Sequence, residues 1–182
     1  MRIINEPTAA ALAYSEKINL EPDGKPRNLL MFDFGGGTFD VTVLSIEEGM
    51  LDVLATRGDS LLGGRDIDNN IFDHCIEEFK TKGIDLVGKL AARAKLKLSC
   101  EQAKKTLSTE MDARILFDPK DGSYEVEIVL TRFKLEELMQ PILNRCIEIV
   151  KLALEDAKFH LQDDPIKEVI LVGGSSSIPK LE

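Results

Sequence analysis

Three consecutive glycines between two apolar runs constrain the fold of this chain more than any other feature. Gly35, Gly36 and Gly37 interrupt a stretch that is otherwise rich in strand-forming residues. The apolar runs are residues 29–34, 39–46 and 50–56. Because tight turns that separate strand-length runs favour pairing between successive strands, the sequence predicts a three-stranded antiparallel meander.

Two amphipathic helices are predicted after this meander. Residues 66–80 place apolar side chains four positions apart with charged residues between them, which is the stripe of a half-buried helix. A second helix is predicted over residues 87–107. The residues expected to face the core are Leu90, Ala94, Leu98 and Leu107, and those expected to face solvent are Lys89, Arg93, Lys97 and Lys104.

The remaining elements complete a mixed fold. Residues 111–129 alternate weakly around a Pro-Lys-Asp-Gly turn and predict a β-hairpin. Thr131 is expected to cap a long helix that ends near Lys158, with Pro141 either kinking it or opening a second helix. Residues 168–172 are expected to form a buried strand. The order βββα, insertion, α, β predicts an α/β domain that carries an inserted α+β subdomain.

Composition excludes several classes of protein. The net charge of -9 argues against binding to nucleic acid or to anionic membranes, and no apolar run is long enough for a membrane helix. The 3 cysteines are far apart, with no pair spaced for zinc or for a disulfide framework. We therefore expect a soluble domain with no membrane or nucleic-acid partner, and with cysteines that serve as small core residues in a reducing compartment.

The glycine turn also carries the strongest chemical signal. Asp33 precedes the turn, and Thr38 and Asp40 follow it. Glycines permit positive φ and close backbone approach, so their N–H groups can hold phosphate oxygens while the two carboxylates hold Mg²⁺ through its waters or orient an attacking water. The alternative is a tight hairpin turn with two exposed aspartates. The pattern matches neither a Walker A loop nor a dinucleotide fingerprint.

Weaker signals come from glycine pairs at element boundaries and from one helix face. The glycine pairs are Gly63-Gly64 and Gly173-Gly174. The residues that share a helix face are Glu101, Lys104, Lys105 and Ser108. Their spacing would let an acid and lysines bind the polar rim of a nucleotide, although a solvated helix face has the same spacing.

Five stretches resemble, in family order, the nucleotide-binding domain of the seventy-kilodalton heat-shock protein chaperones. They lie within residues 3–11, 32–41, 62–66, 100–104 and 172–175. The resemblance implies the fold shared with actin and sugar kinases, in which two ribonuclease-H-like lobes surround a nucleotide cleft. This chain is similar to the second lobe alone, with residues 1–58 and 131–182 as its ribonuclease-H-like part and residues 59–130 as the inserted subdomain.

The resemblance also implies roles for individual residues. It implies catalytic roles for Glu6, Asp33, Thr38 and Asp40. It places Pro7 at the hinge between the lobes, and Asp33 and Asp40 near Mg²⁺. It implies nucleotide contacts for Gly35, Gly36, Gly37, Thr38, Gly63, Gly64, Glu101, Lys104, Lys105, Ser108, Gly173, Gly174, Ser175, Ser177 and Ile178.

Three positions depart from the family pattern. Arg65 stands where an acidic residue often occurs, and Lys105 and Ser177 stand where arginines are common and sandwich adenine. Without the two flat guanidinium groups we expect weaker or less adenine-selective binding than in a typical member.

The function implied by the resemblance is ATP-driven chaperoning in the stress response, in which binding and hydrolysis of ATP control the binding and release of peptides. ATP or ADP and Mg²⁺ are the implied cofactors. The implied partners are the first lobe, unfolded polypeptides, J-domain cochaperones and nucleotide exchange factors. We expect negligible hydrolysis by this chain alone, because the first lobe supplies the other phosphate loop. The cytoplasm is the default location.

Two alternatives remain at this point. A sugar or acetate kinase would share the phosphate-binding hairpin. A non-catalytic heat-shock relative would bind ATP to hold its shape while acting as a nucleotide exchange factor or cochaperone.

Overall fold

The computed structural model describes residues 6–15, 26–47, 50–117, 126–161 and 165–181. The chain divides into two compact units. Unit 1 comprises Met1–Gly63 and Asn144–Ser176, and unit 2 comprises Gly64–Leu143 and Ser177–Glu182. The domain limits predicted from the sequence stay a prediction. Within the described residues, no helix is both long enough and apolar enough to span a bilayer.

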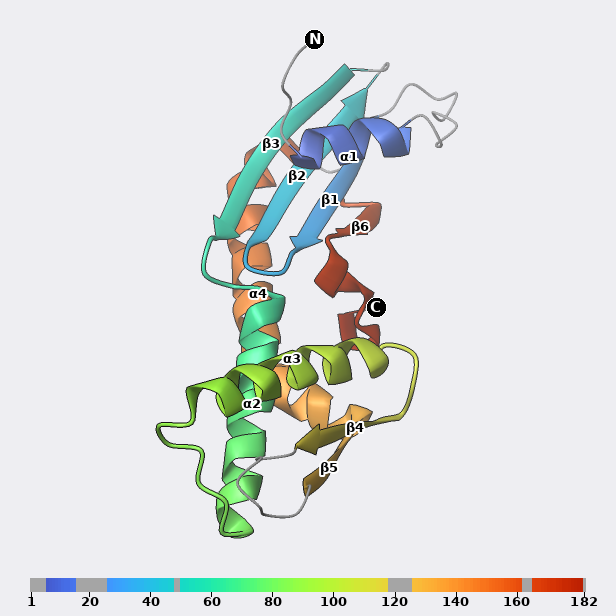
Figure 1. The fold of residues 1–182 in the computed structure, drawn as a ribbon. Helices are drawn as coiled ribbons and strands as arrows, with labels where there is room; N and C mark the ends of the chain where they lie inside the picture. The colour runs from blue at the N-terminus through green and yellow to red at the C-terminus, as the bar shows by residue number, and fades with distance from the viewer. Residues whose placement is uncertain (1–5, 16–25, 48–49, 118–125, 162–164, 182) are drawn as a thin grey trace. The chain divides into compact units, whose positions relative to one another are not determined.

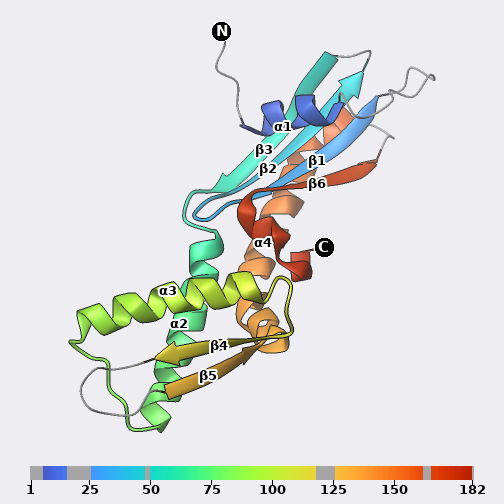
Figure 2. The same cartoon turned by 45° about the vertical axis from the view of Figure 1, so that its right-hand side comes forward.

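Unit 1 is built on a four-stranded mixed sheet with the strand order β3-β2-β1-β6 (Figure 1). The strands are β1 (Arg27–Phe34), β2 (Phe39–Glu47), β3 (Met50–Asp59) and β6 (Glu168–Val172). The first three pair antiparallel, which confirms the predicted meander. Strand β6 returns to lie parallel to β1, as Figure 2 shows. The chain is therefore a mixed α/β fold with a mixed sheet.

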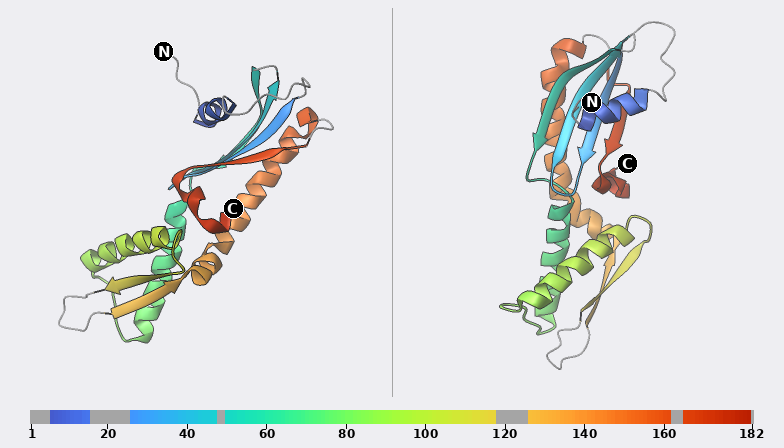
Figure 3. Two further views of the ribbon diagram at one scale, coloured as in Figure 1. Left: turned by 90° about the vertical axis from the view of Figure 1, so that its right-hand side faces the viewer. Right: turned by 45° about the horizontal axis from the view of Figure 1, so that its top comes forward.

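Helices lie on both faces of this sheet. Helix α1 (Glu6–Ser15) lies on one face, and the part of helix α4 (Arg132–Leu161) that belongs to unit 1 lies on the other (Figure 3, left). On the α1 side, Ala11 packs against Met31 and Leu44 in a small apolar core. Side chains alternate between the two faces along each strand, so both faces of the sheet carry apolar residues.

Strand β6 is less buried than the sequence predicted. Its side chains alternate, and Val169 and Leu171 keep 59% and 36% of their surface exposed. Ile170 and Val172, on the other face, pack against the core around Met31. The continuous apolar run suggested burial on both faces, but in this structure β6 is an edge strand of the sheet, and only one of its faces is covered.

Unit 2 combines two helices, a hairpin and the first part of α4. Its elements are α2 (Gly64–Thr81), α3 (Leu90–Thr106), β4 (Asp112–Phe117) and β5 (Val126–Thr131), with a 3-10 helix at Pro179–Leu181. Helix α2 buries the predicted stripe, and its Phe79 ring lies 5.0 Å from that of Phe117 on β4. The predicted hairpin is present, although its turn lies outside the described residues.

The predicted inner face of α3 is wrong except at Leu107, which directly follows the helix and is fully buried. Leu90 and Leu98 are 80% and 68% exposed, and Ala94 is exposed as well. The residues that the helix buries instead are Leu96, Cys100, Ala103 and Lys104. The segment carries leucines on both sides of the helix, so spacing alone does not select a face. Packing against α2 and β4 selects it.

Helix α4 begins as the sequence predicted. The backbone N–H of Lys134 donates to the Thr131 hydroxyl oxygen at 3.2 Å, the hydrogen bond of a helix cap. Pro141 lies inside the helix, which continues to Leu161. All three cysteines are buried with free thiols, which confirms their predicted place in the core.

Candidate functional site

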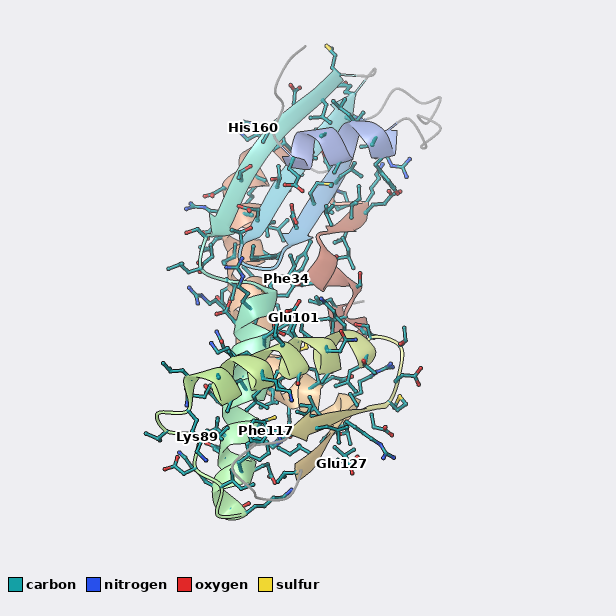
Figure 4. The ribbon with its side chains drawn as sticks, viewed as in Figure 1. Phe34, Lys89, Glu101, Phe117, Glu127 and His160 are labelled. Atoms are coloured by element: carbon teal, nitrogen blue, oxygen red, sulfur yellow. The ribbon has the colours of Figure 1, made fainter. Side chains whose placement is uncertain are left out.

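The glycine turn of unit 1 stands on an aromatic base. Phe34 ends β1 and Phe39 begins β2, and both side chains are fully buried with ring centroids 5.8 Å apart. Figure 4 labels Phe34 where β1 meets the turn. The Gly35 N–H donates to the Thr38 carbonyl at 3.0 Å and closes the turn. Buried rings on both sides thus anchor a short exposed loop.

Close packing explains one end of this turn and leaves the middle open. None of the three glycines has a left-handed φ, so the expectation that they supply positive φ is wrong. A Cβ on Gly63 would lie 2.6 Å from the Gly37 nitrogen, so the loop before α2 packs on the backbone of the turn. A Cβ on Gly36 would have no neighbour within 4 Å. Gly36 therefore presents bare backbone to open space.

Three carboxylates gather at this end of the sheet. Asp33 and Asp40 are direct partners across β1 and β2, and Glu6 begins α1 on the same face. Partial burial raises the pKa of Asp33, and the negative charges of Glu6 and Asp40 raise it further. Among the described residues, no group of three or more His, Cys, Asp or Glu side chains is arranged to hold a metal ion. The acidic cluster suits a cation that keeps its own waters.

The end of β6 closes against the same carboxylates. Val172 is the parallel partner of Asp33, and the next residue, Gly173, has φ of 89°. A Cβ on Gly173 would lie 2.5 Å from the Phe34 carbonyl oxygen and 2.7 Å from Asp33 Oδ1. Position 173 therefore requires glycine for both its backbone conformation and its space. Gly174, in contrast, has open space where a Cβ would stand.

The hydroxyl cluster that follows is partly committed to the local backbone. Ser176 donates its hydroxyl to the Gly173 carbonyl at 2.6 Å, and Ser175 is buried. The structure thus brings one predicted set together in unit 1. That set is Glu6, Asp33, Gly35, Gly36, Gly37, Thr38, Asp40, Gly63 and Gly173.

Sequence reasoning missed Gly58, which is the antiparallel partner of Asp40 on β3. A Cβ at this position would lie closer to Asp40 Oδ1 than 3.0 Å, the shortest distance normally found between a Cβ and a non-bonded atom. It would also lie 3.2 Å from Asp40 Cγ. In the sequence Gly58 is a single glycine near the end of a strand, with no signal that links it to Asp40.

In unit 2 the predicted helix-face residues divide into two kinds. Lys104 was predicted to point outward, but it is 8% exposed, and this prediction is wrong. Its ammonium group donates to the Gly64 carbonyl at 2.9 Å and pairs with Asp68 at 2.7 Å. Burial raises the pKa of Asp68 even though the Lys104 charge opposes that shift. Lys104 thus fastens α3 to the first turn of α2.

The other residues of that face remain accessible. Lys105 donates to Glu101 at 2.7 Å on the exposed side of α3, where Figure 4 labels Glu101. This ion pair lowers the pKa of Glu101 and raises that of Lys105. Ser108 follows the helix with its N–H donated to the Lys105 carbonyl at 3.2 Å.

The last predicted residues lie near the chain ends. Ser177 is exposed and Ile178 is buried, and both belong to unit 2. Pro7 lies in the first turn of α1, and its hinge role stays a prediction. The roles of all the predicted site residues remain predictions, since geometry gives their places and not their ligands.

Comparison with known proteins relates this chain to one family. A family model described as Hsp70 protein matches residues 1–182. Heat shock cognate 70 kDa protein 3 of Dictyostelium discoideum is 44% identical over 182 residues, covering 100% of this chain and 28% of that protein. Heat shock 70 kDa protein of Penicillium citrinum is 43% identical over 183 residues, covering 100% of this chain and 35% of that protein. Chaperone protein DnaK of Nitrosopumilus maritimus is 42% identical over 185 residues, covering 98% of this chain and 28% of that protein. The chain thus spans about a third or less of the length of these relatives.

Proposed function

Because the chain belongs to the Hsp70 protein family, we propose that it is the second lobe of a ribonuclease-H-like, actin-type ATPase domain and holds part of an ATP or ADP molecule. One observation carries the proposal. The paired carboxylates of Asp33 and Asp40 stand beside a turn whose Gly36 backbone is open to a ligand. Phosphates would lie against that backbone, and a cation would lie against the carboxylates.

The residues of unit 1 suit phosphates that carry Mg²⁺. Asp33 and Asp40 would hold the ion through its waters, and the ion would neutralise charge on the phosphate oxygens. The exposed Thr38 hydroxyl can donate to a phosphate oxygen. Asp33, whose pKa is raised by burial and by its acidic neighbours, can orient a water and accept its proton.

For unit 2 we propose contacts to ribose and adenine, on the resemblance alone. Glu101, Lys105 and Ser108 are accessible for such contacts, whereas the Lys104 ammonium already has two partners. Lys105 and Ser177 would hold adenine more loosely than arginines would, because neither offers a flat guanidinium group.

For the whole protein we propose ATP-driven chaperoning. Hydrolysis would require the first lobe, and its partners would be unfolded polypeptides, J-domain cochaperones and nucleotide exchange factors. We propose the cytoplasm as its location. The relatives are named as heat shock proteins and as the chaperone DnaK, which favours this function over the exchange-factor alternative.

The proposal is tested by NMR titration of this chain with ADP and Mg²⁺, with adenosine as the matched ligand that lacks phosphates. We expect ADP, and not adenosine, to shift the amide signals of Gly36 and Thr38. The variant Gly36→Val should fold, because its side chain enters open space, and should lose the ADP-dependent shifts. Equal shifts with adenosine would overturn the proposal.

Calorimetry tests whether nucleotide binding depends on the first lobe. Mg·ADP binding is measured for this chain and for the same chain preceded by its first lobe. Tighter binding and ATP turnover only in the longer protein would support a lobe that contributes part of a site. No binding by either protein would refute the proposal.

A further inference from the structure

We propose that Gly58 is a positioning residue that sets where the Asp40 carboxylate lies and keeps it apart from Asp33. The importance of this role for Mg²⁺ and phosphate rests on the proposed function. The geometry itself does not, because it concerns two neighbouring strands of unit 1.

The argument begins from a row of residues across the four strands. Asp33 on β1 and Asp40 on β2 are direct partners. Outside them stand two glycines, Gly58 opposite Asp40 on β3 and Gly173 directly after β6. Asp40 therefore lies between Asp33 and Gly58, whereas Asp33 lies between Asp40 and Val172, with Gly173 as the next residue after Val172.

Both carboxylates lean toward their glycines. Asp40 Oδ1 lies closer than 3.0 Å to the place where a Cβ of Gly58 would stand, and Asp33 Oδ1 lies 2.7 Å from the corresponding place at Gly173. The two side chains thus diverge, each into the space that a missing side chain leaves.

Electrostatics explains why divergence matters. Side chains that are direct partners on antiparallel strands have Cβ atoms about 4.5–5.5 Å apart, and like charges in that arrangement repel. Asp33 already carries a raised pKa, caused partly by the Asp40 charge. Leaning apart reduces the repulsion, and under the proposed function a hydrated cation would lie between the two carboxylates.

Space for the Asp40 carboxylate, and not backbone conformation, is what glycine provides at position 58. Gly58 has no left-handed φ, so alanine could adopt its backbone without strain. An alanine Cβ would, however, overlap the Asp40 carboxylate and lie 3.0 Å from the Phe39 carbonyl oxygen. The carboxylate would have to rotate away from β3, toward Asp33 or out of the site.

A double-mutant cycle on this chain tests the coupling without any nucleotide. The four proteins are the native chain, Gly58→Ala, Asp40→Ala and the double variant, and the readout is the urea midpoint of unfolding. We expect Gly58→Ala to lower the midpoint in the native background. In the Asp40→Ala background the same change should lower the midpoint less, because only the contact with the Phe39 carbonyl oxygen remains and alanine restricts the unfolded chain more than glycine does.

The cycle remains informative if one variant does not fold. If Gly58→Ala alone does not fold, the double variant should still fold, because the clashing carboxylate is gone. An equal midpoint shift in both backgrounds, or failure of the double variant to fold, would overturn the proposal. The side-chain χ1 couplings of Asp40 give a direct readout, and they should change in Gly58→Ala. Unchanged couplings would also contradict it.

A second measurement links the position to Mg²⁺. In folded Gly58→Ala, the Mg²⁺ concentration needed for half of the ADP-dependent shifts should rise about tenfold, the scale seen when residues that orient metal ligands are changed. Val53→Ala, at an exposed position on the same strand, is the control and should leave it unchanged. An unchanged Mg²⁺ requirement in Gly58→Ala would refute the positioning role. If ADP binds neither protein, the proposed function fails, and the cycle and the couplings still decide the geometry.

Discussion

Replacing Lys104 with methionine is expected to destabilise unit 2 far more than the same change at the neighbouring Lys105. Lys104 is 8% exposed and binds both Asp68 and the Gly64 carbonyl. Lys105 pairs with Glu101 on the surface, where an ion pair contributes little to stability. The two lysines are adjacent in sequence and on one helix, so each serves as the control for the other.

The magnitude follows from what Lys104→Met leaves behind. Breaking a buried ion pair by removing one partner costs about 3–5 kcal/mol, because a charge remains buried without compensation. Asp68 keeps 18% of its side-chain surface exposed, so water and protonation relieve part of that cost. We therefore expect a loss of about 2–3 kcal/mol at pH 7. With a urea m value of about 2 kcal/mol/M, the midpoint falls by about 1 M or slightly more.

The pH dependence provides an independent check. Burial raises the pKa of Asp68, so the folded state binds its proton more tightly than the unfolded state does. This group therefore makes the chain less stable as pH rises from the ordinary carboxyl range through the raised pKa. Loss of the Lys104 charge raises that pKa further. The gap between native chain and variant should shrink on acidification, when Asp68 is protonated in both.

Two outcomes would refute this reasoning. Equal urea midpoints for Lys104→Met and Lys105→Met would show that the buried pair has no special weight. A gap that widens as pH falls from 7 toward 4 would show that the Asp68 charge is not its source.

Three further predictions follow from the same structure. Gly173→Ala should lower the free energy of unfolding by about 3 kcal/mol or more, since it combines a left-handed φ with a Cβ 2.5 Å from the Phe34 carbonyl oxygen, whereas Gly174→Ala should be nearly neutral in the same denaturation assay. All three buried cysteines should resist a thiol reagent at pH 8 in the native chain and react in denaturant, and a fast-reacting thiol in the native chain would contradict their burial. The double variant Lys105→Arg, Ser177→Arg should bind ADP more tightly by calorimetry in the longer protein, and equal affinity would remove the adenine-stacking argument.

Local sequence determined the elements of this protein. Apolar runs separated by tight turns predicted the meander, and period-four spacing predicted α2 with its buried stripe. Thr131 marked the start of α4. These features depend on neighbours within a few residues, so the chain's own spacing carries enough information to predict them.

The candidate site was only partly within reach of the sequence. Asp33, Thr38 and Asp40 flank the glycine turn in sequence, so their proximity follows from the predicted hairpin. Gly173 comes from a distant strand, and its contact with Asp33 exists only because β6 pairs parallel with β1. Gly58 carried no signal, because its meaning depends on the side chain opposite it.

Tertiary structure decided which face of each element is buried. The leucines of α3 lie on two sides of the helix, and only packing against α2 and β4 turned Leu96 inward and Leu98 outward. The same packing buried the Lys104 ammonium with Asp68, although lysine ordinarily marks a solvent face. Sequence period specifies the shape of an element, whereas burial is a property of the surfaces that meet, and those surfaces come from segments far apart along the chain.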